Sequence, residues 1–294
     1  IINIIMTKLL IFSISQLHRD PRILRQIQAF KNDYQITTAG LSDPKIDGVG
    51  FINITHGVFK NRYWNRLKAE FNKCLTKWYS SSGEFEKCYW RGLHKHAMGC
   101  VMDVDTDVVI CNDVNALPIC MALKENTGVK LVLDLHEYAV DDSPLNVYHQ
   151  KYISPMWDYF LKKHLMEVDA FMTVCNAISD RYFTEYGRES VVVTNAPAYE
   201  DFSPTPVNGD QIRMIHHGGA MRGRGIENMI HLMDGLGEKF HLTLMLVSNS
   251  RSYLRELKSL AAVKPNVTII DPVPTREISA KINPNGIGLY KLPA

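Results

Sequence analysis

A glycine-rich turn flanked by arginines is the segment of this sequence with the clearest capacity for chemistry. It reads HHGGAMRGRGIENMI over residues 216–230 and follows an apolar run over 212–217. Glycines let a backbone approach a ligand closely, the start of a helix favours anions, and arginines make paired contacts with phosphate. A flexible basic turn has the same composition, so that alternative stays open. The residues expected to form a diphosphate cradle are Gly218, Gly219, Arg222 and Arg224.

A second group of ionisable residues starts at Asp134, where the apolar run 130–134 ends in DLHEYAVDDSP. An imidazole can donate a hydrogen bond to a sugar hydroxyl or carry a proton near neutral pH. We therefore take His136 and Glu137 as candidate catalytic residues, although they could instead only pin the loop. A metal site is disfavoured because no second histidine follows at a helical spacing, and no metal is expected.

Two more polar groups follow apolar runs. In SQLHRDPRILRQIQAF, Asp20 has the character of a helix N-cap and Pro21 that of a first helical residue. Arg19 and Arg22 in the same segment are candidates for phosphate or acceptor contact. In NDVNALP (112–118), we expect Asp113 and Asn115 to cap the following helix. The residues assigned to the acceptor side or the cleft are Arg19, Asp20, Arg22, Asp113 and Asp134.

These groups need strands and helices to position them. Short apolar runs alternate with helical patterns along the chain, which predicts an α/β protein of the doubly wound type. Most runs are apolar at consecutive positions, as in parallel strands covered on both faces. Ligands of such sheets bind at the carboxyl ends of the strands, where all the polar groups above lie. The predicted strands cover 9–15, 107–111, 130–134, 170–174, 191–193, 212–217, 242–247 and 267–270.

The proline-rich stretch 196–210 is the best candidate for a linker. It predicts an N-terminal Rossmann-like domain over 1–195 and a C-terminal Rossmann-like domain over 211–294. Because the second is short for a doubly wound domain, we expect the chain to stop inside it. The apolar start of the chain is interpreted as a buried strand and not as a signal peptide, since Lys8 interrupts it and no small-residue cleavage site follows.

Composition narrows the possible partners. The net charge of +2 gives no reason to expect a nucleic-acid partner, and six cysteines without a C-x-x-C pair favour a reduced, cytoplasmic setting. No apolar run is long enough to predict a transmembrane span. The basic segment 59–79 carries an apolar stripe at helical spacing, which fits either a core-facing helix or one lying on an anionic membrane surface. The stripe consists of Trp64, Leu67, Phe71, Leu75 and Trp78.

Taken in order along the chain, these segments resemble the retaining glycosyltransferases of family 4. The resemblance rests on the DPR helix start at 20–22, DLHEY at 134–138, VDAFMTVCNAISDRYFTEYG at 168–187, VVVTNAP at 191–197 and the glycine-rich turn. It implies the GT-B fold, in which two Rossmann-like domains face a cleft. It also implies transfer of a sugar from a UDP- or GDP-linked donor to a glycan or lipid-linked acceptor, with retention of configuration and without a metal cofactor.

The resemblance also implies roles for single residues. Arg224 matches the basic residue that contacts the diphosphate in this family, and His136 matches a histidine near the donor sugar. Gly218 stands where many members have a further arginine, so Arg222 would have to serve, and the family's E-x₇-E region would lie beyond Ala294. Two alternatives stay open, a sugar-nucleotide epimerase of the same fold and a non-catalytic nucleotide-sugar-binding subunit. A nicotinamide dehydrogenase is disfavoured because no G-x-G-x-x-G follows the first strand.

Overall fold

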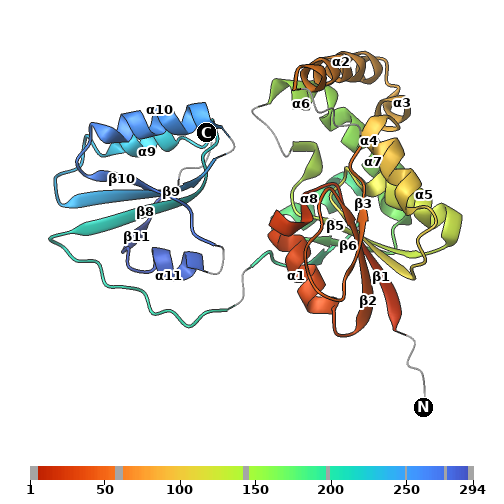
Figure 1. The fold of residues 1–294 in the computed structure, drawn as a ribbon, viewed down its shortest axis with the longest axis horizontal. Coiled ribbons are helices and arrows are strands. Elements are labelled where there is room, and N and C mark those ends of the chain that lie inside the picture. Colours follow the sequence, from red (N-terminus) through yellow and green to blue (C-terminus); the bar gives the residue numbers. More distant parts are fainter. Residues whose placement is uncertain are drawn as a thin grey trace. The chain divides into compact units, whose positions relative to one another are not determined.

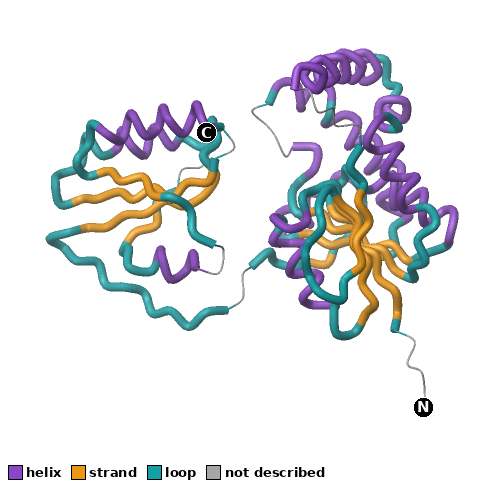
Figure 2. Tube along the Cα trace, viewed as in Figure 1, coloured by secondary structure: helices purple, strands orange, loops and turns teal. Residues whose placement is uncertain are grey.

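The structure is a computed structural model that describes residues 6–56, 62–141, 146–196, 199–248, 250–274 and 277–290. The chain forms two compact units, and it passes from one to the other between Ala196 and Pro197. Each unit has a parallel β-sheet with helices packed on it (Figure 1, and by element type in Figure 2). The predicted α/β class with two Rossmann-like units is confirmed.

The first unit is built on a seven-stranded sheet in which every pair of neighbours is parallel. The strand order is β3-β2-β1-β4-β5-β6-β7, so the winding direction changes between β1 and β4. In an open sheet, this switch point is where the loops diverge and leave a crevice for ligands. The strands are β1 Thr7–Ser13, β2 Tyr34–Gly40, β3 Gly50–Asn53, β4 Val108–Asn112, β5 Lys130–Leu135, β6 Ala170–Thr173 and β7 Val191–Val192.

Helices cover both faces of this sheet, which explains why its central strands are apolar at consecutive positions. On one face, Ile23 and Ile27 pack against Ile11, and on the other Phe160 belongs to the same cluster as Leu133. The helices are α1 Pro21–Phe30, α2 Arg62–Ser81, α3 Phe85–Tyr89, α4 Gly92–Val101, α5 Leu117–Thr127, α6 Val147–Tyr152, α7 Ser154–His164 and α8 Asn176–Tyr186. The described residues of this unit also form the 3₁₀ turns η1 Leu17–Arg19, η2 Ala139–Asp141 and η3 Leu165–Glu167.

The second unit has a four-stranded parallel sheet of order β10-β9-β8-β11. Its core joins Ile230 with Leu244 and Leu257. The order repeats that of β3-β2-β1-β4, so a second switch point lies between β8 and β11. The elements are β8 Ile212–Gly219, α9 Ile226–Leu232, β9 Phe240–Val247, α10 Arg251–Ala262, β10 Val267–Ile270, α11 Ile278–Ile282 and β11 Ile287–Gly288.

All eight predicted strands are present, and their predicted ends differ from the observed ends by no more than two residues. Three further strands were not predicted, namely β2, β3 and β11. The sequence of β2, YQITTAG, interrupts its apolar residues with threonines, and β3 and β11 are short. Between Val193 and Gln211, the described residues form no helix or strand, and Pro197 and Ala198 of the predicted linker lie outside them. Residues 1–5 of the predicted first strand segment also lie outside.

We predict that Leu133→Ala destabilises the first unit by about 2–5 kcal/mol, since truncation of a fully buried leucine leaves a cavity. Leu67→Ala is the matched control, because Leu67 is 43% exposed on α2. This substitution should change the free energy of unfolding by no more than about 0.5 kcal/mol. Urea unfolding of the two variants tests the assignment, and equal losses would contradict it.

Candidate functional site

The loop after β1 carries the first part of a polar cluster at the β1/β4 switch point. Asp20 is the N-cap of α1, and its Oδ1 accepts a hydrogen bond from the Arg22 backbone N–H at 3.1 Å. Its other carboxylate oxygen accepts one from Ser15 Oγ at 3.0 Å. Pro21 is the first helical residue. The predicted helix start is therefore confirmed, and it fixes a buried carboxylate at the edge of the sheet.

The guanidinium of Arg22 joins Asp20 to Asp113, which follows β4. Arg22 Nε and Nη2 lie 3.1 and 3.2 Å from the Asp20 carboxylate. Arg22 Nη1 and Nη2 lie 3.3 and 3.4 Å from the two oxygens of Asp113. The positive charge of Arg22 is thus paired with two carboxylates of the protein. Arg19, also assigned to this side from the sequence, is exposed at the end of η1 and outside these contacts.

The two carboxylates bound by Arg22 titrate in opposite directions. Burial disfavours ionisation of Asp20, but the hydrogen bonds and charge of Arg22 outweigh it, so the pKa of Asp20 is lowered. At Asp113 burial dominates and the pKa is raised, although Arg22 and His136 act against that rise. Asp113 also adopts a left-handed backbone conformation with φ of 69°. Asp20 is therefore the firmly ionised partner, and Asp113 is the one that takes up a proton more readily.

Asp134 and His136 form the adjoining part of the cluster, at the end of β5. The Asp134 carboxylate accepts a hydrogen bond from Gln26 Nε2 at 2.8 Å, and Gln26 also donates to Asn112 Oδ1 at 2.9 Å. His136 Nε2 lies 3.1 Å from Asp134 Oδ2, but without hydrogen-bond geometry. Both ring nitrogens of His136 are buried and make no hydrogen bond within the described residues. The imidazole of His136 is thus buried at the sheet edge beside the Asp134 carboxylate.

The expectation that Asp113 and Asn115 cap the next helix is wrong. The N-cap of α5 is Ala116, and no side chain caps it. The backbone carbonyl of Asn115 instead accepts a hydrogen bond from Tyr89 Oη at 2.6 Å, and Asp113 is turned to Arg22. The distant arginine competes successfully with the local backbone for the Asp113 carboxylate.

A cavity of about 400 Å³ adjoins the cluster. Arg22, Asp113 and Glu137 contribute to its wall, together with His149 from α6 and Trp157 from α7. The last two were not singled out from the sequence, where neither belongs to a recognisable motif. The backbone carbonyl of Glu137 accepts a hydrogen bond from Tyr182 Oη at 3.1 Å, which fixes the chain at this wall. An aromatic ring beside several polar groups suits a ligand with both apolar and hydroxyl-bearing faces.

In the second unit, the carboxyl end of β8 brings Gly218, Arg224 and His216 together. Gly218 has a φ of 148°, and a Cβ at this position would lie 3.7 Å from Arg224 Nη1 and 3.9 Å from His216 Nε2. The guanidinium of Arg224 is therefore folded back over the glycine. His216 Nδ1 lies 3.0 Å from the carbonyl oxygen of Leu289, while its buried Nε2 makes no hydrogen bond in the described part of the chain. Gly219 ends the strand beside them.

Arg222 is turned to a different partner. Its Nη2 lies 2.5 Å from Glu256 Oε2, and its guanidinium stacks over the ring of Tyr253 at 4.6 Å. Both partners belong to α10. Of the two arginines assigned to the diphosphate cradle, Arg224 is thus the one that the structure places at Gly218.

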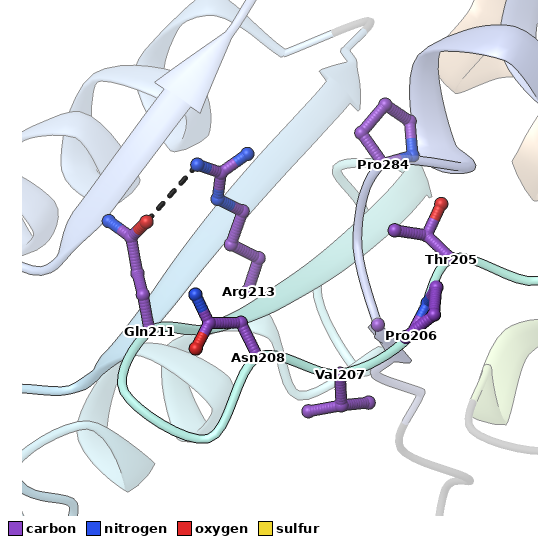
Figure 3. A pocket seen from close by; sticks show the side chains of 8 residues that line it. Thr205, Pro206, Val207, Asn208, Gln211, Arg213 and Pro284 are labelled. Carbon is purple, nitrogen blue, oxygen red and sulfur yellow. Dashed lines mark hydrogen bonds between the residues drawn. The ribbon is translucent and has the colours of Figure 1, made fainter.

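A separate pocket of about 230 Å³ lies at the other end of β8 (Figure 3). Arg213, the second residue of β8, lines it and donates a hydrogen bond to Gln211 at 3.1 Å. Gly218 and Gly219 are at the opposite, carboxyl end of the same strand. This pocket is therefore distinct from the predicted diphosphate cradle.

No model of a known protein family matches the sequence, and no curated protein matches it significantly. Solved structures do match. A sucrose-phosphate synthase from Thermosynechococcus elongatus is 11% identical, with a TM-score of 0.64 over 98% of this chain and 77% of that one. The Anabaena protein HepE, solved with UDP-glucose, is 11% identical, with a TM-score of 0.61 over 97% and 73%.

The lipopolysaccharide outer core galactosyltransferase WaaB in its apo form is 12% identical, with a TM-score of 0.55 over 97% of this chain and 74% of that one. These neighbours are GT-B glycosyltransferases, so the chain has the GT-B fold. At such low identity, the likeness defines the fold and leaves the activity to be argued from the site.

We predict that Arg22→Met lowers the free energy of unfolding by roughly 2–4 kcal/mol at neutral pH, because Asp20 and Asp113 lose their ion-pair partner. Arg22 lowers the pKa of Asp20, so its stabilising effect is present above the ordinary aspartate pKa and is lost as the pH falls through the folded-state value. The deficit of the variant should therefore shrink in acid.

Urea unfolding across a pH series measures this deficit, with Arg19→Met as the control outside the cluster. A deficit in Arg22→Met that does not shrink as the pH falls would refute the charge assignment, since Arg22 stabilises the ionised form of Asp20.

Proposed function

We propose that this chain is a nucleotide-sugar-dependent glycosyltransferase. It transfers a sugar from a UDP- or GDP-linked donor to a glycan or lipid-linked acceptor and retains the configuration of the transferred sugar. The observation that carries the proposal is the position of Arg224 over Gly218, at the carboxyl end of β8 in a GT-B fold. HepE, a neighbour in fold, is solved in complexes with UDP and with UDP-glucose.

The donor diphosphate binds at the end of β8 in this proposal. Gly218 has no side chain, so a phosphate can approach the backbone where a Cβ would otherwise point to Arg224 and His216. The guanidinium of Arg224 then stabilises the negative charge that grows on the leaving diphosphate. The proposal needs no metal cofactor, because a fixed cation of the protein supplies this charge. His216 Nδ1 donates to the carbonyl oxygen of Leu289, so its Nε2 donates to the diphosphate only when the ring is protonated.

The transferred sugar and the acceptor bind at the first unit. The buried ring of His136 has both nitrogens available within the described contacts, and Asp134 lies beside Nε2 at 3.1 Å. His136 donates to a hydroxyl of the sugar, while Glu137 in the cavity wall contacts the acceptor. With retention, the leaving phosphate takes the proton of the attacking acceptor hydroxyl on the same face of the sugar. The acceptor oxygen then bonds to the anomeric carbon as the donor's glycosyl–phosphate bond breaks.

The charge of this edge bears on the acceptor. Because Arg22 is committed to Asp20 and Asp113, its positive charge is already balanced. Arg22 faces two carboxylates, and Asp134 adds a third at the same edge. A neutral, hydroxyl-bearing acceptor group fits this wall better than a phosphorylated one.

We predict that UDP or GDP binds this protein and that Arg224→Ala weakens the binding about tenfold or more, because a charge-assisted contact to the diphosphate is lost. Arg213→Ala, an exposed arginine at the amino end of β8, is the matched control and should bind as the parent does. Isothermal titration calorimetry gives the dissociation constants. Equal binding by parent and Arg224→Ala would reject the donor site.

We predict that His136→Ala lowers sugar transfer by about a hundredfold or more while nucleotide binding persists, since the side chain acts on the sugar and not on the base. His241→Ala, near the amino end of β9, is the control. Transfer is followed by nucleotide release and by the anomeric proton signal of the product. An isomerised sugar nucleotide formed without any acceptor would favour the epimerase alternative instead.

A further inference from the structure

Helix α2 turns its most apolar side away from the rest of the first unit. Tyr63, Leu67, Phe71 and Trp78 are 63%, 43%, 64% and 62% exposed. At 3.6 residues per turn they fall within roughly a quarter of the helix circumference. We name these four residues the α2 apolar face. The side chain of Trp64, from the predicted stripe, lies outside the described residues, as do residues 59–61.

The opposite side of α2 packs against α3 and α6. Thr76 Oγ1 on that side accepts a hydrogen bond from Arg91 Nη2 at 3.0 Å, and the Arg91 guanidinium lies over the ring of Tyr79 at 5.3 Å. Figure 1 shows α2 as the outermost element of its unit, above α6. A surface helix ordinarily buries its apolar stripe and exposes its polar side. In α2, Leu67, Phe71 and Trp78 of the predicted stripe are exposed instead, and only Leu75 is half-buried, so the core-facing alternative is wrong for these three residues.

Basic residues border the α2 apolar face. The sequence of α2 contains five lysines and arginines and a single acidic residue, Glu70. At helical spacing, Arg66, Lys73 and Lys77 fall along one border of the face, and Lys68 falls along the other. Lys73 also pairs with Glu70 at 3.0 Å. Two copies of this helix placed face to face would repel one another, whereas a surface of opposite charge would attract it.

We propose that the α2 apolar face docks the protein on an anionic lipid surface. Tyr63 and Trp78 are of the types that favour the boundary between lipid and water, where Leu67 and Phe71 would enter the acyl region. The lysines reach the headgroups while their aliphatic stems stay against the apolar face. None of the helices in the described ranges is long and apolar enough to cross a bilayer, and a helix lying in the interface does not need to be.

The docking surface has a consequence for the acceptor, which rests on the function proposed above. Helix α6 packs against α2, and its His149 lines the 400 Å³ cavity beside Asp113. A lipid surface under α2 would therefore lie next to an element of the acceptor wall. We infer that the acceptor is carried on a lipid and is not a freely soluble glycan.

Co-sedimentation with vesicles tests the docking without any assay of activity. The probes are vesicles of phosphatidylcholine alone and vesicles with equal parts of phosphatidylglycerol, each at low and high salt. The double variant Phe71→Ser/Trp78→Ser removes two aromatic side chains of the α2 apolar face, which are 64% and 62% exposed. The matched control Met166→Ser/Phe183→Ser removes two side chains that are 59% and 52% exposed elsewhere in the same unit.

We expect the parent to bind the anionic vesicles and to bind them less at high salt, and Phe71→Ser/Trp78→Ser to bind about tenfold more weakly. Arg66→Gln/Lys77→Gln should weaken binding about fivefold per charge, against the control Lys31→Gln/Lys258→Gln. Undiminished binding by the aromatic variant, or an equal loss in its control, would overturn the proposal. So would a parent that binds no vesicles, or one that forms a dimer abolished by Phe71→Ser/Trp78→Ser. Nucleotide binding, measured separately, stays unchanged in all these variants, so a failure here is distinguishable from failure of the transferase proposal.

Discussion

The ion pairs of Arg22 with Asp20 and Asp113 are the contacts on which the first candidate site depends. Asp20 caps α1 and thereby fixes where that helix begins, and the same carboxylate orients the Arg22 guanidinium. The guanidinium then reaches Asp113, which follows β4. Since β1 and β4 are the two strands at which the winding of the sheet reverses, one arginine ties together both sides of the switch point. Loss of that tie would free two loops at once.

The two units share a strand order, but the carboxyl edges of their sheets carry side chains of different charge. At the β1/β4 edge Arg22 is balanced by two carboxylates, and Asp134 adds to their charge. At the β8 edge a glycine, an arginine and a buried histidine converge. A diphosphate needs positive charge and close approach to the backbone, while sugar hydroxyls need acceptors and neutral donors. The β8 edge therefore has the chemistry that suits a diphosphate, and the β1/β4 edge has the chemistry that suits sugar hydroxyls, which supports the function proposed above.

The sequence predicted those features that depend on residues close together in the chain. Strands buried on both faces were found because their apolar residues are consecutive, and the α1 start was found because Asp-Pro has its own capping chemistry. Contacts between distant residues left no such signal. Gln26 bridges Asn112 and Asp134, which are 86 and 108 residues away, and the capping role expected for Asp113 was displaced by an arginine 91 residues away. Arg222 likewise faced a partner, Glu256, that its own segment does not reveal.

The environment of helix α2 could not be predicted from its sequence either. The spacing of its apolar residues defines one face of the helix, but periodicity cannot tell whether that face meets the protein or something else. In the structure, Arg91 and α6 contact the side of α2 that carries Thr76, so the apolar face points away from them. Full burial of one large apolar side chain contributes about 1.5–3 kcal/mol, and these four half-exposed side chains each lack part of that contribution. The basic residues at the borders of that face support the lipid docking proposed above, because their charge attracts anionic lipid and repels a second copy of the helix.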